Sequence, residues 1–480
     1  MPFRSTVASY FEDLAKILDG EDEQQRMVRE GLSPGMTEEE LSEYRDRRVS
    51  EHINHAYNNT DFYRNLLDEE NIDPEEIQTV EDLSRIPPTT GEDLEQADMD
   101  FPDYPFLATG WDEVARVNES SGTGGGDPKQ QMMSYEDMER NGLEQARIYG
   151  GELGIDESDT VLQLLPFSLN TSGFTGYKGA EAIDATQLTA GVMVPPEKHA
   201  QLVDEYQPEA IIALPSYANR FTDVLEQQGI DPADSSIENV IVGGEAFTDK
   251  QLSMMEDKYD ARVTQAYGMT EAGGITGGEV EIGNGMHLLE DNFIFEIVDP
   301  KTYEPVEDGE IGEVLFTPVG RDAMPLIRYA PRDFSRFRTD EDVISTPFSR
   351  IDTPWRKHNV ADIEGVEIYP GKVGDKILDI DEELKREHGI NGEFKITLDY
   401  EEDESQYQMD IEVEGDRRTE MVENEMKGSL FEILEFSSID SQTVADINVD
   451  VVPKGELQTK GKAERIELTD DYREFKGMEL

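Results

Sequence analysis

The sequence predicts a large α/β N-terminal domain with parallel sheets and a small α+β C-terminal domain, joined by a hinge. From about residue 160, short apolar stretches alternate with helical ones, and each apolar stretch ends at a Gly, Pro or Ser loop. The pattern changes after Trp355. Strands that alternate with helices form parallel sheets with right-handed crossovers. We therefore expect a large domain over residues 1–355 and a small mobile domain over 356–480.

The expected elements follow in chain order. The region up to about residue 100 is predicted to be helical, because apolar and aromatic side chains recur at helical spacing over 37–67. The predicted strands of the large domain are 160–165, 210–214, 239–242 and 262–266, and 287–299 and 312–317 form a β-rich segment. In the small domain, strands are expected near 393–400, 407–414 and 447–452, with a helix near 418–434.

Charge excludes several classes of partner. The chain has 42 Lys and Arg against 108 Asp and Glu, a formal net charge of −66. Such an excess repels nucleic acid and anionic membranes, so neither is an expected partner. High net charge can accompany disorder, but 8% of residues are aromatic and apolar runs recur between turn signals. The acids are spread as on a halophile's surface, where molar salt shortens the Debye length to ~3 Å, so we expect loss of structure in low salt.

The sequence also restricts chemistry and location. Cysteine is absent, which excludes disulfides, a thiolate nucleophile and Cys-ligated metals. No apolar stretch approaches the ~20 residues of a membrane-spanning helix, and the amino terminus does not read as a secretory signal. We expect a soluble, cytoplasmic protein. Among the histidines, His52 and His55 are expected on a helix surface and His287 is expected to be structural.

The sharpest motif is a glycine-rich stretch from Ser120 to Lys129. Its backbone N–H groups and hydroxyls could wrap an anion. It is not a Walker loop, because Lys-Ser or Lys-Thr does not follow the glycines at the required spacing. A flexible surface loop is the alternative interpretation. The candidate residues are Ser120, Ser121, Gly122, Thr123, Gly124, Gly125 and Gly126.

Two motifs directly follow predicted strands, where ligands bind in parallel sheets. The stretch from Ala266 to Glu271 offers an aromatic ring, a hydroxyl and a carboxylate that could hold Mg²⁺ beside phosphates; an ordinary turn is the alternative. The stretch Gly243-Gly244-Glu245-Ala246 lets the backbone approach a flat ligand.

Two further motifs lie towards the carboxyl terminus. The stretch from Pro325 to Asp333 ends in a carboxylate that suits a ribose diol, and a salt-bridged loop is the alternative. The stretch from Pro453 to Arg465 gathers three lysines, including Lys462, which could instead offset the surrounding acid.

In this order and at these distances, the five motifs resemble the acyl-adenylate-forming (AMP-binding) superfamily, in its phenylacetate–coenzyme A ligase branch. The resemblance extends from about Tyr44 to Leu468. It implies activation of an aryl-acetate-like carboxylic acid by ATP and Mg²⁺, followed by transfer to coenzyme A as co-substrate. Homodimers are common in this family, so a homodimer is an expected assembly.

The resemblance also implies residue roles. The loop Ser120 to Gly126 would grip the phosphates, Gly243 to Ala246 would line the adenine and Tyr267 would stack near it. Thr270 would touch the phosphates, Glu271 would hold Mg²⁺, and Asp333 would accept the ribose hydroxyls. Arg356 would open the hinge segment, and Lys462 would bridge the carboxylate and the α-phosphate. The acyl pocket would contain Phe167, the 174–179 loop, Pro215, Ser216, Tyr217, Ala266 and Gly268.

Some positions depart from the family pattern. Asp127 precedes Pro128 where a lysine is usual, and Lys129 could substitute for that lysine. Two other functions therefore stay open. One is an adenylyltransferase that stops at AMP transfer, for example onto a deazaflavin coenzyme, and the other is a non-catalytic nucleotide-binding homologue. Pyrophosphate release without a thioester would indicate the first, and no release would indicate the second.

Overall fold

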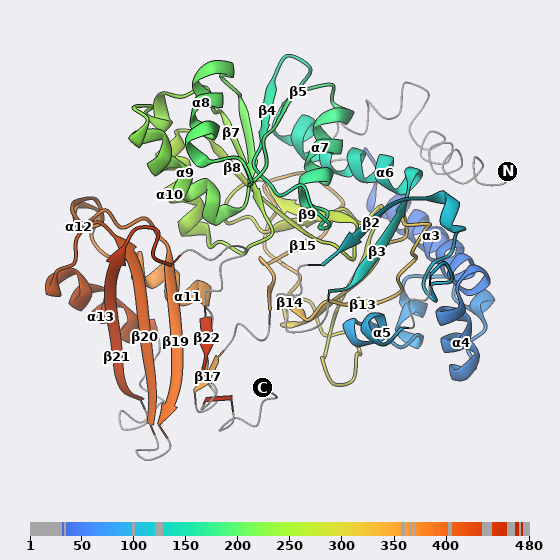
Figure 1. Ribbon diagram of the computed structural model, residues 1–480. Helices are drawn as coiled ribbons and strands as arrows, with labels where there is room; N and C mark the ends of the chain where they lie inside the picture. Colours follow the sequence, from blue (N-terminus) through green and yellow to red (C-terminus); the bar gives the residue numbers. More distant parts are fainter. Residues whose placement is uncertain are drawn as a thin grey trace. The chain divides into compact units, whose positions relative to one another are not determined.

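The computed structural model forms two compact units (Figure 1). It describes residues 31–32, 35–97, 101–120, 128–356, 361–363, 366–368, 370–401, 406–433, 444–457, 466–469 and 472–473. The first unit comprises the residues up to Ala213, Ser235–Gly244 and Arg262–Pro354. The second comprises Leu214–Asp234, Glu245–Ala261 and the residues from Trp355 on. The expected domains, 1–355 and 356–480, and the mobility of the smaller one stay predictions.

Near the start of the described part of the first unit lie two helices, α3 (Glu38–Asn59) and α4 (Asp61–Glu70). Thr37 and Glu40 form a capping box at the start of α3, which satisfies two amide groups that have no partner within the helix. Thr60 ends α3 and caps α4, because its side chain accepts from the Tyr63 amide. The apolar face of α3 is buried, which confirms the helical spacing seen in the sequence. Among the described residues, no helix is long and apolar enough to cross a membrane.

A mixed eight-stranded sheet forms the centre of the first unit, in the order β15-β10-β9-β8-β7-β6-β4-β5. The strands from β8 to β5 are parallel, and β9, β10 and β15 run antiparallel to their neighbours. Every residue of β6 is buried, as expected for a strand covered on both faces. The bounds are β4 Thr160–Gln163, β5 Thr186–Thr189, β6 Ala210–Ala213, β7 Asn239–Gly243, β8 Arg262–Met269, β9 Gly274–Glu279, β10 Met286–Leu288 and β15 Arg350–Ile351.

The described part of the first unit also contains a β-hairpin and a second sheet. The hairpin of β2 (Val114–Glu119) and β3 (Gln130–Ser134) brackets the glycine-rich stretch. A second sheet has the order β1-β13-β12-β14, and β11 also pairs with β12. Its strands are β1 Thr89–Thr90, β11 Ile294–Val298, β12 Gly312–Thr317, β13 Tyr329–Ala330 and β14 Asp333–Ser335. The other α-helices among the described residues of the first unit are α5 Gly91–Gln96, α6 Tyr135–Ala146, α7 Ser172–Ala182 and α8 Pro196–Tyr206.

The second unit has its own apolar core. Its sheet has the order β21-β20-β19-β22, and β17 pairs with β18. The three strands and the helix predicted after residue 393 are present, and the α/β plus α+β fold class is confirmed. The elements are α9 Pro215–Gln227, α10 Asp249–Tyr259, β16 Trp355–Arg356, β17 Ala361–Ile363, β18 Val366–Ile368, α11 Pro370–Ile377, α12 Glu382–His388, β19 Phe394–Glu401, β20 Gln406–Gly415, α13 Glu420–Ile433, β21 Val444–Pro453 and β22 Ile466–Leu468.

The expected surface position of His52 is wrong. Its side chain is 4% exposed, and Nε2 lies 2.9 Å from the Leu326 carbonyl oxygen, to which it donates. His52 falls on the same face of α3 as Val49, Ile53 and Ala56, so helical geometry directs it into the core. His287 is also buried, and its Nε2 lies 3.0 Å from Asp342 Oδ2, in agreement with its predicted structural role.

Candidate functional site

The ends of β7 and β8 bring four predicted residues together. Gly243 pairs with Ala266, and Tyr267 and Gly268 directly follow Ala266 along β8. A Cβ at Gly243 would lie 3.0 Å from the Ala266 carbonyl oxygen, and a Cβ at Gly268 would lie 2.3 Å from that of Gly274. Gly268 therefore needs to be glycine, whereas a side chain at Gly243 would make a tight contact that a small shift of the backbone could relieve. In open α/β folds, ligands bind at the carboxyl ends of the parallel strands, which is where these residues lie.

Asp333, the predicted ribose-binding residue, lies next to Tyr267. The Tyr267 hydroxyl donates a hydrogen bond of 2.9 Å to Asp333 Oδ2. Asp333 begins β14 and is 6% exposed, whereas Tyr267 is half-buried. The tyrosine thus fixes one carboxylate oxygen, so a diol bound there would meet an oriented acceptor.

Glu271, the predicted magnesium ligand, has a similar partner. The Tyr329 hydroxyl donates a 3.1 Å hydrogen bond to Glu271 Oε1. Thr270 and Glu271 lie in the turn between β8 and β9, which the Gly273 amide closes by donating to the Thr270 carbonyl oxygen at 2.8 Å. The described residues contain no group of three or more His, Asp or Glu side chains that could hold a metal. A cation here would take one carboxylate and complete its shell from phosphates and water, as Mg²⁺ commonly does.

Ser120 and Lys129 close the base of the glycine-rich loop. The Ser120 amide donates to the Lys129 carbonyl oxygen at 2.9 Å, and the Lys129 amide donates to Ser120 Oγ at 2.9 Å. Ser120 therefore anchors the loop at its stem. The other predicted loop residues, Ser121, Gly122, Thr123, Gly124, Gly125 and Gly126, lie outside the described residues.

Helix α5 supplies an acidic partner to each of two motif segments. Lys129 Nζ lies 2.7 Å from Glu95 Oε1, and these side chains are 16% and 25% exposed. Arg332, next to Asp333, lies 2.8 Å from Glu92 Oε1, but both side chains are 63% exposed. The lysine that could replace the usual loop lysine is thus held by a carboxylate, and its contact is the better shielded of the two.

Of the remaining predicted nucleotide residues, Gly244 lies in the first unit, and the others lie in the second unit or outside the described residues. Glu245 and Ser216 are in the second unit, where Glu245 Oε2 accepts from the Ser216 amide at 3.0 Å. Ala246 belongs to the same unit, and Arg356 is half-buried on β16. Gly244 ends its segment of the first unit with φ of 89°, a conformation that favours glycine. Lys462 lies outside the described residues.

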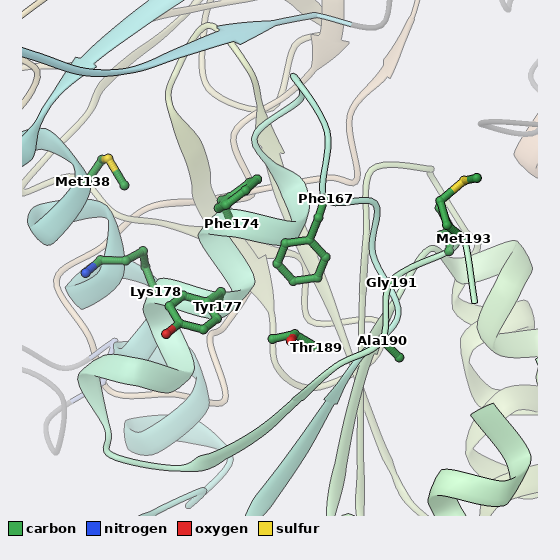
Figure 2. Close-up of a pocket in the computed structure, with 10 residues that line it drawn as sticks. Met138, Phe167, Phe174, Tyr177, Lys178, Thr189, Ala190, Gly191 and Met193 are labelled. Carbon is green, nitrogen blue, oxygen red and sulfur yellow. The ribbon is translucent and has the colours of Figure 1, made fainter. Parts of the chain in front are cut away.

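A cavity of about 440 Å³ lies in the first unit, beyond the carboxyl ends of β4 and β5 (Figure 2). Phe167 and Phe174 meet edge to face at 5.3 Å between ring centroids. The Arg116 guanidinium lies 3.6 Å from the Phe174 ring centroid and donates to the carbonyl oxygens of Ser168 and Asn170. The lining residues are Met138, Phe167, Phe174, Tyr177, Lys178, Thr189, Ala190, Gly191, Val192 and Met193.

Lys178, the charged residue in the lining of this cavity, is paired with carboxylates. Lys178 Nζ donates to Glu139 at 2.7 Å and to Glu181. Burial lowers the pKa of Lys178, but these hydrogen bonds outweigh that effect and raise the pKa above its ordinary value. The ammonium is therefore charged and engaged by two carboxylates, and the other lining residues are apolar or aromatic except Thr189.

The cavity contains only part of the predicted acyl pocket. Phe167, Phe174, Tyr177 and Lys178 line it, whereas Ala266 and Gly268 are not among the described residues that do. Pro215, Ser216 and Tyr217 belong to the second unit.

The sequence reasoning missed Met138 and the segment from Thr189 to Met193. One signal could have identified that segment. Residues 185–196 contain no charged side chain in a chain of which 31% is charged, and they follow a strand.

The chain is similar to several known proteins. The sequence model of the family described as AMP-binding enzyme matches residues 32–320. Phenylacetate-coenzyme A ligase from Thermus thermophilus is 30% identical over 355 residues, which are 72% of this chain and 76% of that protein. The Pseudomonas putida phenylacetate-coenzyme A ligase is 31% identical over 349 residues, 71% of this chain and 76% of that protein.

Solved structures extend the likeness to the fold. 2-Hydroxyisobutyryl-CoA ligase, solved in the postadenylation state with 2-HIB-AMP, has a TM-score of 0.79 and 21% identity, covering 94% of this chain and 93% of that one. The same ligase has also been solved with 2-HIB-AMP and CoA in the thioesterification state, with a TM-score of 0.65, 22% identity and coverage of 94% and 93%. At these identities the likeness establishes the fold.

Proposed function

We propose that this chain, which belongs to the AMP-binding enzyme family, activates a carboxylic acid with ATP to an acyl-adenylate and transfers the acyl group to coenzyme A. The observation that carries this proposal is the 30–31% identity to phenylacetate-coenzyme A ligases over about three quarters of those proteins. It makes the chain an AMP-forming acid–thiol ligase.

The reaction suits a site without a protein nucleophile. A carboxylate is a poor acyl donor because its leaving group would be oxide. Attack of a carboxylate oxygen on the α-phosphorus forms the acyl-AMP bond and breaks the bond to pyrophosphate. The thiol sulfur of coenzyme A then attacks the acyl carbon, and AMP leaves. Both reactants of the first step are anionic, so catalysis rests on positioning and on charge neutralisation.

In the first unit, the tyrosine–carboxylate pairs support the nucleotide roles. Asp333 accepts the ribose hydroxyls, and Tyr267 both orients that carboxylate and borders the adenine. Glu271 provides one carboxylate to Mg²⁺, which when bound neutralises phosphate charge, and Thr270 donates its hydroxyl to a phosphate. Support comes from the two hydrogen bonds of 2.9 and 3.1 Å and from the place of Tyr267, Thr270 and Glu271 at, or directly after, the carboxyl end of β8.

The other roles rest on the family resemblance. The Ser120–Gly126 loop grips the phosphates, Gly243, Gly244, Glu245 and Ala246 line the adenine, and Arg356 opens the hinge. Lys462 bridges the carboxylate and the α-phosphate, and its place in a mobile domain lets it leave after adenylation.

Location and assembly complete the proposal. We assign the enzyme to a salt-rich cytoplasm on its acidic composition, and we assign a homodimer on the resemblance. Sedimentation in molar KCl measures the assembly directly, and a monomer mass would reject the dimer.

The test is pyrophosphate release by the full chain with ATP, Mg²⁺ and a panel of carboxylic acids in molar KCl, with and without coenzyme A. We expect acid-dependent release and, with coenzyme A, an acyl thioester. Release without any thioester would favour the adenylyltransferase instead. No release with any acid would favour a non-catalytic nucleotide-binding protein.

Lys462→Ala tests the role of the tail lysine. It should lower adenylation by orders of magnitude while the melting temperature stays unchanged. Full activity of this variant would reject the assignment of Lys462.

A further inference from the structure

We infer that the cavity next to Phe167 and Phe174 receives the hydrophobic body of the acid substrate, and that this body is larger than one phenyl ring. This inference rests on the proposed function, and it specifies the substrate class that the same site takes.

The volume of the cavity indicates that the substrate body is larger than one phenyl ring. An engineered, enclosed apolar protein cavity of about 150 Å³ holds one benzene molecule, whereas this cavity, which is partly open to solvent, measures about 440 Å³. A phenyl ring would leave most of the space to water. Because apolar burial contributes in proportion to the area removed from water, a fused bicyclic or long alkyl body gains more from this cavity than a single ring does.

The residues that line the cavity indicate that the bound part of the substrate is uncharged. Residues 160–177 and 185–196, which supply most of the lining, contain no charged side chain although the chain carries a net charge of −66. Lys178, the charged lining residue, is engaged by Glu139 and Glu181. A second anionic group on the ligand would meet those carboxylates, so the part of the acid that enters is uncharged.

The walls also combine fixed and adaptable surfaces. Arg116 holds the 168–170 loop and lies over Phe174, and the Gly191 backbone (φ 65°) approaches Phe167 so closely that a Cβ would lie 3.1 Å from its ring. Met193 is 91% exposed at the rim, with Val192 beside it at 39%. Figure 2 shows Met193 and Met138 on opposite sides of the two phenylalanines. Flexible methionines can close over bodies of different shape.

The experiment compares kcat/KM of pyrophosphate release for phenylacetate, 2-naphthylacetate, indole-3-acetate and decanoate in molar KCl. We expect at least one of the three larger acids to exceed phenylacetate tenfold or more, with the aromatic and alkyl arms showing which body fits better. Equal values, or a preference for phenylacetate, would overturn the inference and leave the proposed function standing.

Two variants test whether the preference for larger acids arises in this cavity. Thr189→Phe places a ring into the cavity from the end of β5 and should reduce the ratio of larger acid to phenylacetate at least tenfold. Val343→Phe adds the same ring at an exposed position, 69% accessible, that does not line the cavity, and should keep the ratio. An unchanged ratio in a folded Thr189→Phe protein would reject this cavity as the acyl site.

Measurements of acid binding distinguish failure of this inference from failure of the proposed function. If no acid releases pyrophosphate, the proposed function fails, and calorimetry of the same acids with the wild-type protein still tests the cavity. Tighter binding of the larger acids, weakened by Thr189→Phe, would support the inference. Absence of binding would overturn it.

Discussion

The Tyr267 hydroxyl donates a 2.9 Å hydrogen bond to Asp333 Oδ2, although the two residues lie 66 positions apart in the chain. If Asp333 binds the ribose, loss of this bond leaves its carboxylate less well oriented. Tyr267→Phe should raise the KM for ATP by roughly fivefold, the equivalent of about 1 kcal/mol for one hydrogen bond, with little change in kcat. Steady-state kinetics in molar KCl measure this effect.

A matched control is Tyr57→Phe. Tyr57 also donates to an aspartate, Asp68, at 3.0 Å, but on the exposed surface of the N-terminal helices. The KM for ATP of the Tyr57→Phe variant should equal that of the wild type. Equal effects of the two substitutions would contradict the role of Tyr267.

Glu271→Gln should raise the Mg²⁺ concentration for half-maximal pyrophosphate release about tenfold, because a neutral amide is a weaker ligand for a hard cation. Tyr329→Phe removes the hydroxyl that orients Glu271 and should cause a smaller change in the same direction. Titration of Mg²⁺ at fixed ATP measures both. A normal metal response of Glu271→Gln would refute the magnesium role.

If Lys129 binds the triphosphate, Glu95 competes with the triphosphate for it, since the Lys129 and Glu95 side chains are 2.7 Å apart and only 16% and 25% exposed. Glu95→Gln should therefore lower the KM for ATP by roughly threefold, and Lys129→Met should raise it by a similar or larger factor. Glu92→Gln is the matched control, because its contact with Arg332 is exposed and such pairs contribute little. If Glu95→Gln raised the KM, Glu95 would orient Lys129 for binding and would not compete for it.

His52 should make the protein less stable in acid. Burial lowers the pKa of His52 to about 4, partly offset by its hydrogen bond to the Leu326 carbonyl oxygen. Its pKa in the unfolded chain is about 6.5, so the unfolded state binds more protons between these values. The contribution of His52 to the free energy of unfolding is therefore largest above pH 6.5. It falls by about 3 kcal/mol as the pH drops to 4, from the 1.36 kcal/mol per pKa unit.

Denaturant unfolding of His52→Gln across pH 7 to 4 tests this linkage. The variant should lose less stability over this range than the wild type does. His55→Gln, on the same helix and half-buried, is the matched control. The linkage is rejected if all three proteins share one pH slope.

Salt should stabilise the fold strongly. A net charge of −66 repels itself in dilute buffer, and molar KCl screens that repulsion. We expect the melting temperature to rise by about 10 °C or more between dilute buffer and 3 M KCl, because self-repulsion of this size destabilises the compact state. A melting curve that does not move with KCl would contradict the halophilic interpretation.

Four of the five parallel strands were predictable because apolar runs such as 210–214 are bounded by loop residues, and β6 occupies Ala210–Ala213. Strand β5 and, on the antiparallel side, β9 were not predicted. Strand β9 contains Gly274, Gly277 and Gly278, and such a composition reads as a turn. These glycines let neighbouring backbones approach, since a Cβ at Gly277 would lie 2.2 Å from the His287 carbonyl oxygen. That requirement exists only once the strands have paired.

The amino-acid order alone determined most of the parallel strands, the net charge and the family, because these follow from local periodicity, composition and motif spacing. Only the tertiary structure decided which side chains meet. Tyr267 with Asp333, Tyr329 with Glu271 and Lys129 with Glu95 each join separate segments. Such contacts depend on strand register and on how each loop returns to the sheet. No local sequence pattern encodes strand register or the path of a loop. The cavity lined by residues of α6, α7 and the segment after β5 likewise depends on tertiary structure.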